Sequence, residues 1–339
     1  MPKYQIPSFA EISSLDNLFA SWNNFKRDKK SKADVALFTT NLIANLSKLE
    51  HELKSGLYRH GPYYHFKISD PKPRDIHKAS VRDRIVHHAL YRVLYPHFER
   101  LFIFDSYSCR LKKGTHRALR RLAKLAGQNS HNQTLKVLVL KGDIKKCFAS
   151  IDHSILKSIL AKQIKDRQTM DLLNEVIDSF SPKGKKVGLP LGNLTSQLFV
   201  NVYLNEFDRF VKHQLKEQYY IRYTDDFVIL SQNQERLENL IFQINSFLTD
   251  NLRLTLHPTK VSIKTFSSGV DFLGWVHFFD YRVLRTVTKK RMLDKIETDP
   301  TPAVINSYLG LLSHGQGFKL QARVKRRGQI NWNPSAPSI

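Results

Sequence analysis

Two adjacent carboxylates, Asp225 and Asp226, lie between two apolar segments that are rich in β-branched and aromatic residues. This pattern predicts a hairpin that presents both acids at its tip. Because adjacent side chains on a strand point to opposite faces, the two acids can share a metal ion only where a turn bends the backbone. A third acid, Asp143, ends a short apolar strand predicted over residues 138–142. Three carboxylates in such positions indicate a two-metal site for phosphoryl transfer.

Each of these acids also has an ordinary structural interpretation. An Asp-Asp pair between two strands is commonly turn chemistry, and a single Asp at the end of a strand is commonly just solvated. The balance changes when the three occur together on a chain with 54 Lys and Arg against 30 Asp and Glu, a formal net charge of +24. Such an excess of cations indicates a polyanion as the partner.

Composition excludes several classes of protein. The 339 residues, 41% of them hydrophobic, suffice for two or three subdomains with a substantial core. No apolar run approaches the roughly 20 residues needed to span a bilayer, and the N-terminus lacks a secretory signal. Cys109 and Cys147 have no CxxC spacing, so neither a disulfide framework nor a cysteine-rich zinc site is predicted. These features predict a cytoplasmic protein without membrane attachment.

The apolar pattern predicts the elements that position the acids. Helical spacing marks residues 1 to about 55, and an amphipathic helix begins at Ser80. The aromatic-rich residues 58–68 predict strands, and the basic segment 110–124 is either a solvated helix face or a nucleic-acid contact. Asp152 is predicted to cap a helix and not to bind metal.

The second half of the chain predicts a sheet. The expected elements are a long helix from about 195 to 216, the acidic hairpin, a helix over about 235–248, a period-two strand over 252–256 and a second hairpin around 270–275. Their order predicts an α+β fold with a four-stranded antiparallel sheet backed by helices on one face. That sheet would carry Asp143 beside Asp225.

Several short motifs follow one another along the chain. They are Arg-Asp-Arg-Ile-Val at 82–86, Ser-Tyr-Ser-Cys-Arg at 106–110, Asp143 followed five residues later by Phe148, Tyr-Thr-Asp-Asp at 223–226, Leu-His-Pro-Thr-Lys at 256–260, Phe-Leu-Gly-Trp at 272–275 and Ser-Tyr-Leu-Gly-Leu-Leu at 307–312. In this order they resemble the motifs of reverse transcriptases over roughly residues 58–325. Any one of them is weak, and the ordered set is specific.

The resemblance implies a right-hand polymerase fold with fingers, a palm made of the antiparallel sheet, and a helical thumb. The expected divisions are an N-terminal helical extension over 1–57, fingers over 58–135, a palm over 136–287 with an insertion near 165–195, a thumb over 288–327 and a tail over 328–339.

The resemblance also implies catalytic roles. Asp143 and Asp225 would bind two Mg²⁺ ions, with Mn²⁺ as an alternative, while Asp226 assists and the Ile144 carbonyl completes the shell of the nucleotide's ion. Lys260 would donate a proton to the leaving pyrophosphate or only screen its charge. Other expected contacts are Phe148 as a gate against a ribose 2′-hydroxyl, Lys72, Arg74, Leu191, Gly192 and Gln197 at the nucleotide, and Arg110, Tyr223, Phe272, Leu273, Gly274 and Trp275 at the primer and template.

One motif narrows the subfamily. Residues 191–197 read Leu-Gly-Asn-Leu-Thr-Ser-Gln, where most reverse transcriptases of the group II intron type read QGxxxSP. The GxxxSQ form resembles the enzymes of diversity-generating retroelements, which copy a template-repeat RNA with errors opposite adenine. Leu191 cannot donate the hydrogen bonds of a glutamine, so checking of the incoming nucleotide could relax; the alternative is simple packing beneath the template. The chain also ends soon after the thumb motif, without room for maturase or endonuclease regions.

The expected function is therefore an RNA-directed DNA polymerase that uses dNTPs, a template RNA and the resulting cDNA/RNA hybrid. The retroelement subtype implies a small, basic, oligomeric accessory protein as a further partner. Alternatives are a phage-defence or intron-like reverse transcriptase, and a non-catalytic RNA-binding scaffold. The scaffold is disfavoured because three clustered acids repel one another unless a metal offsets their charge.

Overall fold

A four-stranded antiparallel sheet carries the three acids at one of its ends. The structure, a computed structural model, describes residues 7–69 and 73–330. In spatial order the strands are β4 (Tyr220–Tyr223), β5 (Asp226–Ser231), β3 (Leu138–Asp143) and β6 (Ser262–Thr265). The register places Asp143 directly opposite Asp226. The backbone N–H of Ile144 donates to the carbonyl of Asp225 at 3.0 Å, so Asp225 lies one step further along. The predicted four-stranded antiparallel sheet is confirmed.

Helices cover both faces of this sheet. On one face, α10 (Leu194–Arg209) and α11 (Gln234–Leu252) pack against Leu140 and Ile229; on the other, α6 (Thr115–Asn129) packs against Val139 and Val228. The prediction of helices on one face was wrong. Consecutive strand residues are apolar here, which is the pattern of a strand that is buried on both sides.

The predicted strand over 252–256 was also wrong. Helix α11 continues to Leu252 and ends at Arg253, which has a positive φ of 49°. Leu254 and Leu256 are buried as the chain leaves the helix, and Leu256 forms only an isolated bridge with Ile144. Apolar and polar residues alternate over 252–256 because this connection packs Leu254 and Leu256 against the core. The fourth strand of the sheet is β6.

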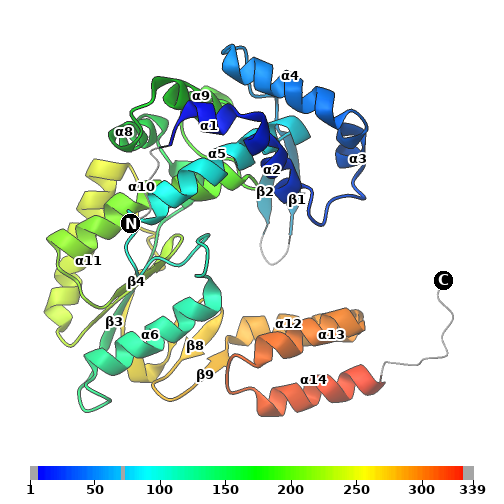
Figure 1. Cartoon of the computed structure of the whole chain (residues 1–339). Coiled ribbons are helices and arrows are strands. Elements are labelled where there is room, and N and C mark those ends of the chain that lie inside the picture. The colour runs from blue at the N-terminus through cyan, green and yellow to red at the C-terminus, as the bar shows by residue number, and fades with distance from the viewer. Residues whose placement is uncertain (1–6, 70–72, 331–339) are drawn as a thin grey trace, which may run out of the picture.

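The first part of the chain is mostly helical, as predicted. Four short helices precede the hairpin, and Ser80 caps the helix that follows it. The elements are α1 (Phe9–Ser13), α2 (Leu15–Phe25), α3 (Ala33–Thr40), α4 (Leu42–Lys54), β1 (Tyr64–Ile68), β2 (Arg74–Lys78) and α5 (Val81–Glu99). Residues 58–63 are not a strand. In Figure 1 the β1–β2 hairpin extends from beneath α2 and α3.

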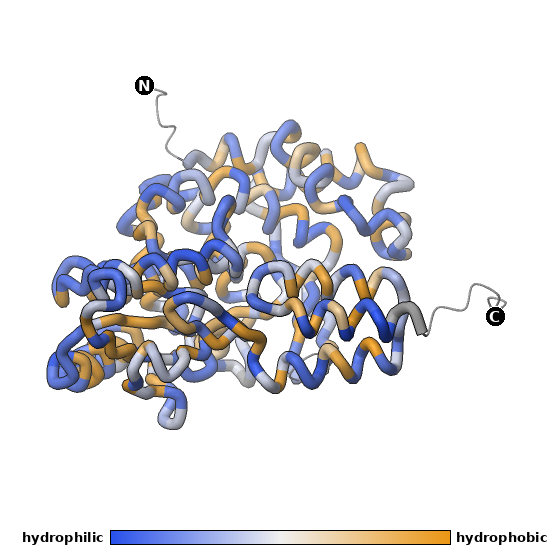
Figure 2. The backbone as a smooth tube through the Cα atoms, turned by 90° about the horizontal axis from the view of Figure 1, so that it is seen from below, coloured by the Kyte–Doolittle hydropathy of each residue, from blue (hydrophilic) through white to orange (hydrophobic). Residues whose placement is uncertain are grey.

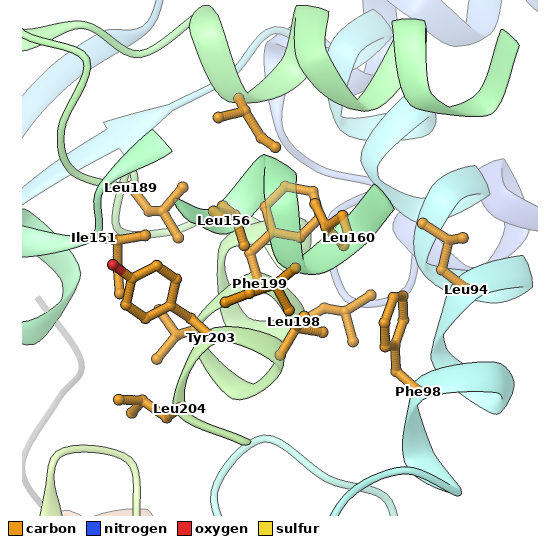
Figure 3. Packing of buried hydrophobic residues seen from close by; sticks show 14 of the residues in the cluster. Leu94, Phe98, Ile151, Leu156, Leu160, Leu189, Leu198, Phe199, Tyr203 and Leu204 are labelled. Atoms are coloured by element: carbon orange, nitrogen blue, oxygen red, sulfur yellow. The ribbon is translucent and has the colours of Figure 1, made fainter. Parts of the chain in front are cut away.

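Helix α10 is the centre of the larger hydrophobic core. Its side chains Leu198, Phe199, Tyr203 and Leu204 are buried among residues of α5 and α8 (His153–Gln163) (Figure 3). Asp152 caps α8, as predicted, by accepting hydrogen bonds from two backbone N–H groups. The remaining helices of this region are α7 (Cys147–Ser150) and α9 (Arg167–Asp178). The α-helical part of the predicted long helix ends at Arg209, and a π-helical turn over Phe210–Gln214 follows it directly.

A second sheet links the rest of the molecule to three C-terminal helices (Figure 1). Its strands are β7 (Val270–Phe272), β8 (Trp275–His277) and β9 (Arg282–Leu284), and the helices are α12 (Thr286–Thr298), α13 (Pro302–Leu312) and α14 (Phe318–Ile330). Apolar and polar residues alternate along these helices (Figure 2). Met292, Ile296, Leu312 and Val324 are buried between them. In the described part of the chain, every helix is too short or too polar to cross a membrane.

Candidate active site

The acidic hairpin turns through two residues, Thr224 and Asp225. Tyr223 and Asp226 form the last pair of the β4–β5 ladder. Thr224 has a φ of +54°, a conformation that a β-branched residue rarely adopts. Its side-chain hydroxyl donates to the Oγ of Ser108 at 2.5 Å. Because a disfavoured backbone conformation persists only where its surroundings hold it, this turn is constrained by contacts outside the hairpin.

The three acids meet at one end of the sheet. Asp143 is 7% exposed, and its carbonyl accepts a hydrogen bond of 2.7 Å from the backbone N–H of His257. Asp225 and Asp226 are half-buried at the turn. Both backbone segments are therefore fixed by hydrogen bonds, and the sequence prediction that the acids converge is confirmed by their positions.

The charges of this cluster are only partly compensated. The pKa of Asp225 is raised to about 6, mainly by burial and further by the negative charges of Asp226 and Asp143. Burial and Asp143 also raise the pKa of Asp226, against the opposing effect of Lys141 and other cations. The Lys260 ammonium donates to Oδ2 of Asp143 at 2.9 Å. Among the residues that the structure describes, Lys260 thus forms a direct ion pair with one of the three carboxylates.

The donor set suits a hard divalent cation. Carboxylate and carbonyl oxygens are the ligands that Mg²⁺ prefers, and a cation would relieve the repulsion that raises these pKa values. Within residues 7–69 and 73–330, no three His, Cys, Asp or Glu side chains are arranged to hold an ion as they stand. Asp143 is engaged by Lys260. Binding therefore requires the carboxylate side chains to rearrange.

Phe148 follows Asp143 in the sequence and contacts the segment that leads to the motif at residues 191–197. Its ring is half-buried against the larger core, and its carbonyl accepts a hydrogen bond of 2.8 Å from the backbone N–H of Leu189. This contact links the segment after Asp143 to the chain that leads to Gly192. Its role as a gate stays a prediction.

Gly192 faces the β1–β2 hairpin. It has a φ of +106°, and a Cβ atom at this position would lie 3.0 Å from Cγ2 of Ile76. The carbonyl of Leu191 accepts from the N–H of His77 at 2.9 Å, and the amide of Asn193 donates to the His77 carbonyl at 2.8 Å. Glycine is therefore favoured here by the backbone conformation, and a larger residue would also require the Ile76 side chain to shift.

The other predicted nucleotide contacts lie around this motif. The Leu191 side chain is half-buried, and Gln197 is exposed. Gln197 lines a small cavity with Lys29 and Arg84. Arg74 is exposed at the start of β2, whereas Lys72 lies outside the described residues. The structure thus brings Gly192, Gln197 and the β2 strand together.

Three predicted primer or template contacts need correction. The Arg110 side chain is 4% exposed, and its guanidinium is bound by Glu99 at 2.7 Å and by backbone carbonyls. Phe272 and Trp275 are 0% and 2% exposed in the core beneath the second sheet. These side chains are therefore structural, because no surface remains for a nucleic acid to touch.

The remaining residues of this set stay accessible. Leu273 and Gly274 form the turn between β7 and β8, with φ values of +52° and +85°. Tyr223 is half-buried, and its hydroxyl lies 3.1 Å from Oγ1 of Thr115 on α6. Of the predicted primer contacts, the turn of this hairpin and the Tyr223 ring are thus partly exposed, and their contact with a primer stays a prediction.

Sequence reasoning missed a buried ion pair next to the acidic turn. Arg222 and Asp208 are both 0% exposed, and their side chains are joined by two hydrogen bonds of 2.7 and 2.6 Å. The available signal was a charged residue inside the apolar β4 segment, since a buried arginine needs a partner.

Comparisons with known proteins agree with this geometry. A family model described as reverse transcriptase (RNA-dependent DNA polymerase) matches residues 68–277, more than half of the chain. Protein YkfC of Escherichia coli strain K12 is 26% identical over 298 residues, which cover 76% of this chain and 76% of YkfC. The group II intron-encoded protein LtrA of Lactococcus lactis subsp. cremoris is 24% identical over 316 residues, which cover 73% of this chain and 51% of LtrA. The chain thus spans about half the length of LtrA.

Proposed function

Because this chain belongs to the reverse transcriptase family and is related to group II intron-encoded members, we propose that it copies an RNA template into DNA by two-metal nucleotidyl transfer. The reaction takes place at the acidic end of the β3–β4–β5 sheet. We assign residues 58–135 to fingers, 136–287 to a palm and 288–327 to a thumb.

The observation that carries this proposal is the partly compensated acidic cluster. Asp143, Asp225 and Asp226 meet at one sheet end, where burial and mutual repulsion raise the pKa of Asp225 to about 6. Lys260 pairs with only one of them. Such an arrangement destabilises the protein unless cations bind, which is expected of a metal site.

We assign Asp143, Asp225, Asp226 and the Ile144 carbonyl as ligands of Mg²⁺, with Mn²⁺ as the alternative ion. When bound, the metal would lower the pKa of the primer 3′-hydroxyl and neutralise charge on the triphosphate. Lys260 leaves Asp143 and donates a proton to the pyrophosphate. Its half-exposed side chain has the freedom that this movement needs.

The substrate-selecting residues lie around Gly192. Arg74, with Lys72, clamps the triphosphate, and the half-buried Phe148 ring blocks a ribose 2′-hydroxyl. The lack of a side chain at Gly192 lets β2 pack closely against the motif, because a Cβ there would lie 3.0 Å from Ile76. We assign the Gly192 backbone to contact the template. These assignments are supported by the hydrogen bonds that tie the Gly192 motif to β2.

The C-terminal helices hold the hybrid of RNA and cDNA by its backbone. Exposed cations on α12 and α14 include Lys289, Lys290, Arg291, Lys325 and Arg326. Binding of this kind releases counterions, so affinity falls steeply as salt rises.

We assign the enzyme to a diversity-generating retroelement on the basis of Leu191 and the GxxxSQ pattern. In this assignment Leu191 loosens the check on the incoming nucleotide at template adenines, and a small basic oligomer assists synthesis. The half-buried Leu191 side chain beside β2 is compatible with that role.

Product sequencing tests this proposal. Purified protein is incubated with Mg²⁺, four dNTPs and a primed RNA template, beside an Asp225→Ala, Asp226→Ala control. Complementary cDNA with errors concentrated at template adenines, absent in the control, is expected. Faithful cDNA would move the enzyme towards intron-like or defence relatives, and failure of the wild type to extend any primer, with or without a basic partner, would favour the scaffold.

A further inference from the structure

Two chains of polar contacts run from helix α10 to the catalytic turn. Asp208 and Asn201 lie seven residues apart, so they share one face of this helix. Both side chains are nearly or fully buried, at 0% and 3% exposed. Each leads through one intermediate residue to Thr224, which directly precedes Asp225.

The first chain passes through Arg222. Asp208 accepts from Nε and Nη2 of Arg222 at 2.7 and 2.6 Å, and from the hydroxyl of Tyr220 at 2.7 Å. The remaining arm of the guanidinium, Nη1, donates to the carbonyl of Thr224 at 2.9 Å. Because the carboxylate is bound on both oxygens, the guanidinium can hardly rotate, and its contact with Thr224 is directional.

The second chain passes through Ser108. The Asn201 amide donates to the Ser108 carbonyl at 2.9 Å. The Ser108 hydroxyl then accepts from Oγ1 of Thr224 at 2.5 Å. The loop that carries Ser108 is itself paired to β4, since the N–H of Tyr107 donates to the Arg222 carbonyl at 3.0 Å. The side chain and the carbonyl of Thr224 are thus fixed from two directions.

These contacts account for the backbone of Thr224. The backbone conformation of a β-branched residue at a φ of +54° is disfavoured. Glycine or asparagine would adopt this conformation more easily. The threonine hydroxyl supplies a contact that neither glycine nor a flexible turn would keep, and it holds the residue next to Asp225 in one orientation.

We propose that Thr224 is a positioning residue, held by the Asp208–Arg222 and Asn201–Ser108 arms of α10, that sets the orientation in which Asp225 and Asp226 receive metal ions. The inference rests on the proposed metal-dependent function. It goes further by assigning roles to Thr224 and to the four residues of the two arms. Helix α10 begins next to the Gly192 motif, so one rigid element supports the templating side and the acidic turn.

The test uses two variants that separate the shape of Thr224 from its hydroxyl. Thr224→Val keeps the β-branched shape and removes the hydroxyl, and Thr224→Ser keeps the hydroxyl. Mn²⁺ affinity of the purified protein is measured by electron paramagnetic resonance, and the Mg²⁺ concentration for half-maximal primer extension is measured in parallel. Loss of a residue that orients a ligand commonly weakens metal affinity by about 10–100-fold. We expect such weakening in Thr224→Val and near wild-type behaviour in Thr224→Ser.

A second pair of variants separates positioning from stability. Ser108→Ala removes one arm and should weaken Mn²⁺ binding in the same direction as Thr224→Val. Glu217→Gln disrupts another arginine pair, with Arg236, which lies at the opposite end of β4 from the turn. We expect Glu217→Gln to lower the unfolding temperature without changing Mn²⁺ affinity.

The outcomes distinguish this inference from the function it rests on. Wild-type Mn²⁺ affinity in both Thr224→Val and Ser108→Ala would overturn the inference even if synthesis is robust. A wild-type protein that binds Mn²⁺ but extends no primer would count against the proposed function, while the variants would still decide whether Thr224 positions the acids. Equal weakening by Glu217→Gln would reduce the effect to general destabilisation and also overturn the inference.

Discussion

Two acidic groups near the four-stranded sheet differ in how their charge is balanced. Asp208 is fully buried and bound by Arg222 and Tyr220, which use both carboxylate oxygens. Asp143, Asp225 and Asp226 lie at the sheet's end with a single direct ion pair to Lys260. Burial acts to lower the pKa of Arg222, but the Asp208 carboxylate holds it above its ordinary value, whereas burial and repulsion raise the pKa of Asp225 to about 6. A carboxylate with its full complement of partners is structural, and a cluster that lacks them is where a cation acts.

The largest expected effect comes from Asp225→Asn. Because this change removes a metal ligand, primer extension should fall by at least about 1,000-fold. The ligand-free protein should stay folded and become slightly more stable, since a repelling charge is lost. Rate measurements and thermal unfolding on one preparation check both parts, and loss of activity through unfolding would contradict the comparison.

Asp208→Asn should have the opposite profile. It leaves the buried Arg222 charge without its carboxylate, which commonly costs about 3–5 kcal/mol of stability. Denaturant titration measures this loss. An unfolding free energy equal to that of the wild type would show that Asp208 is not the structural acid we describe.

Lys260→Met removes the cation that pairs directly with Asp143. Removal of a proton donor commonly slows a reaction by about 100-fold or more, and stability should change little because the Lys260 side chain is 44% exposed. Lys264→Met, an exposed lysine on β6, is the matched control with the same loss of charge. Equal single-turnover rates in the two variants would leave Lys260 with charge screening only.

The smallest effect is a pH dependence of stability without metal. The folded state binds the Asp225 proton more tightly than the unfolded state, because its pKa is raised from 3.8 to about 6. The free energy of unfolding should therefore fall as pH rises from about 4 to about 6, by on the order of 1–2 kcal/mol after allowance for solvent screening. Asp225→Asn, titrated in the presence of a chelator, should lack this decrease, and an identical pH profile for both proteins would contradict the raised pKa.

The acids could be predicted from sequence because their signals are local. Asp225 and Asp226 interrupt two apolar strands, and Asp143 ends a third, so strand and turn patterns alone place them at a sheet edge. Gly192 has a local signal of the same kind, a positive φ of +106° beside the close-packed Ile76, while its contact with nucleotide and template stays a prediction.

What failed depends on which way a side chain faces in three dimensions. Arg110 belongs to a basic segment, yet Glu99 draws its guanidinium inward. Phe272 and Trp275 belong to the predicted hairpin, but their rings fill the core below it. The partner of Arg222 lies 14 residues away on α10, and no periodicity within either element reveals such a pairing.

Metal binding at the acidic cluster can be measured by calorimetric titration of Mg²⁺ into the protein bound to a primed RNA template and a non-hydrolysable dNTP analogue. We expect saturable binding of two ions by the wild type and loss of that binding in Asp225→Asn, Asp226→Asn. Binding by the double variant that equals the wild type would contradict the assignment of this acidic cluster as the metal site.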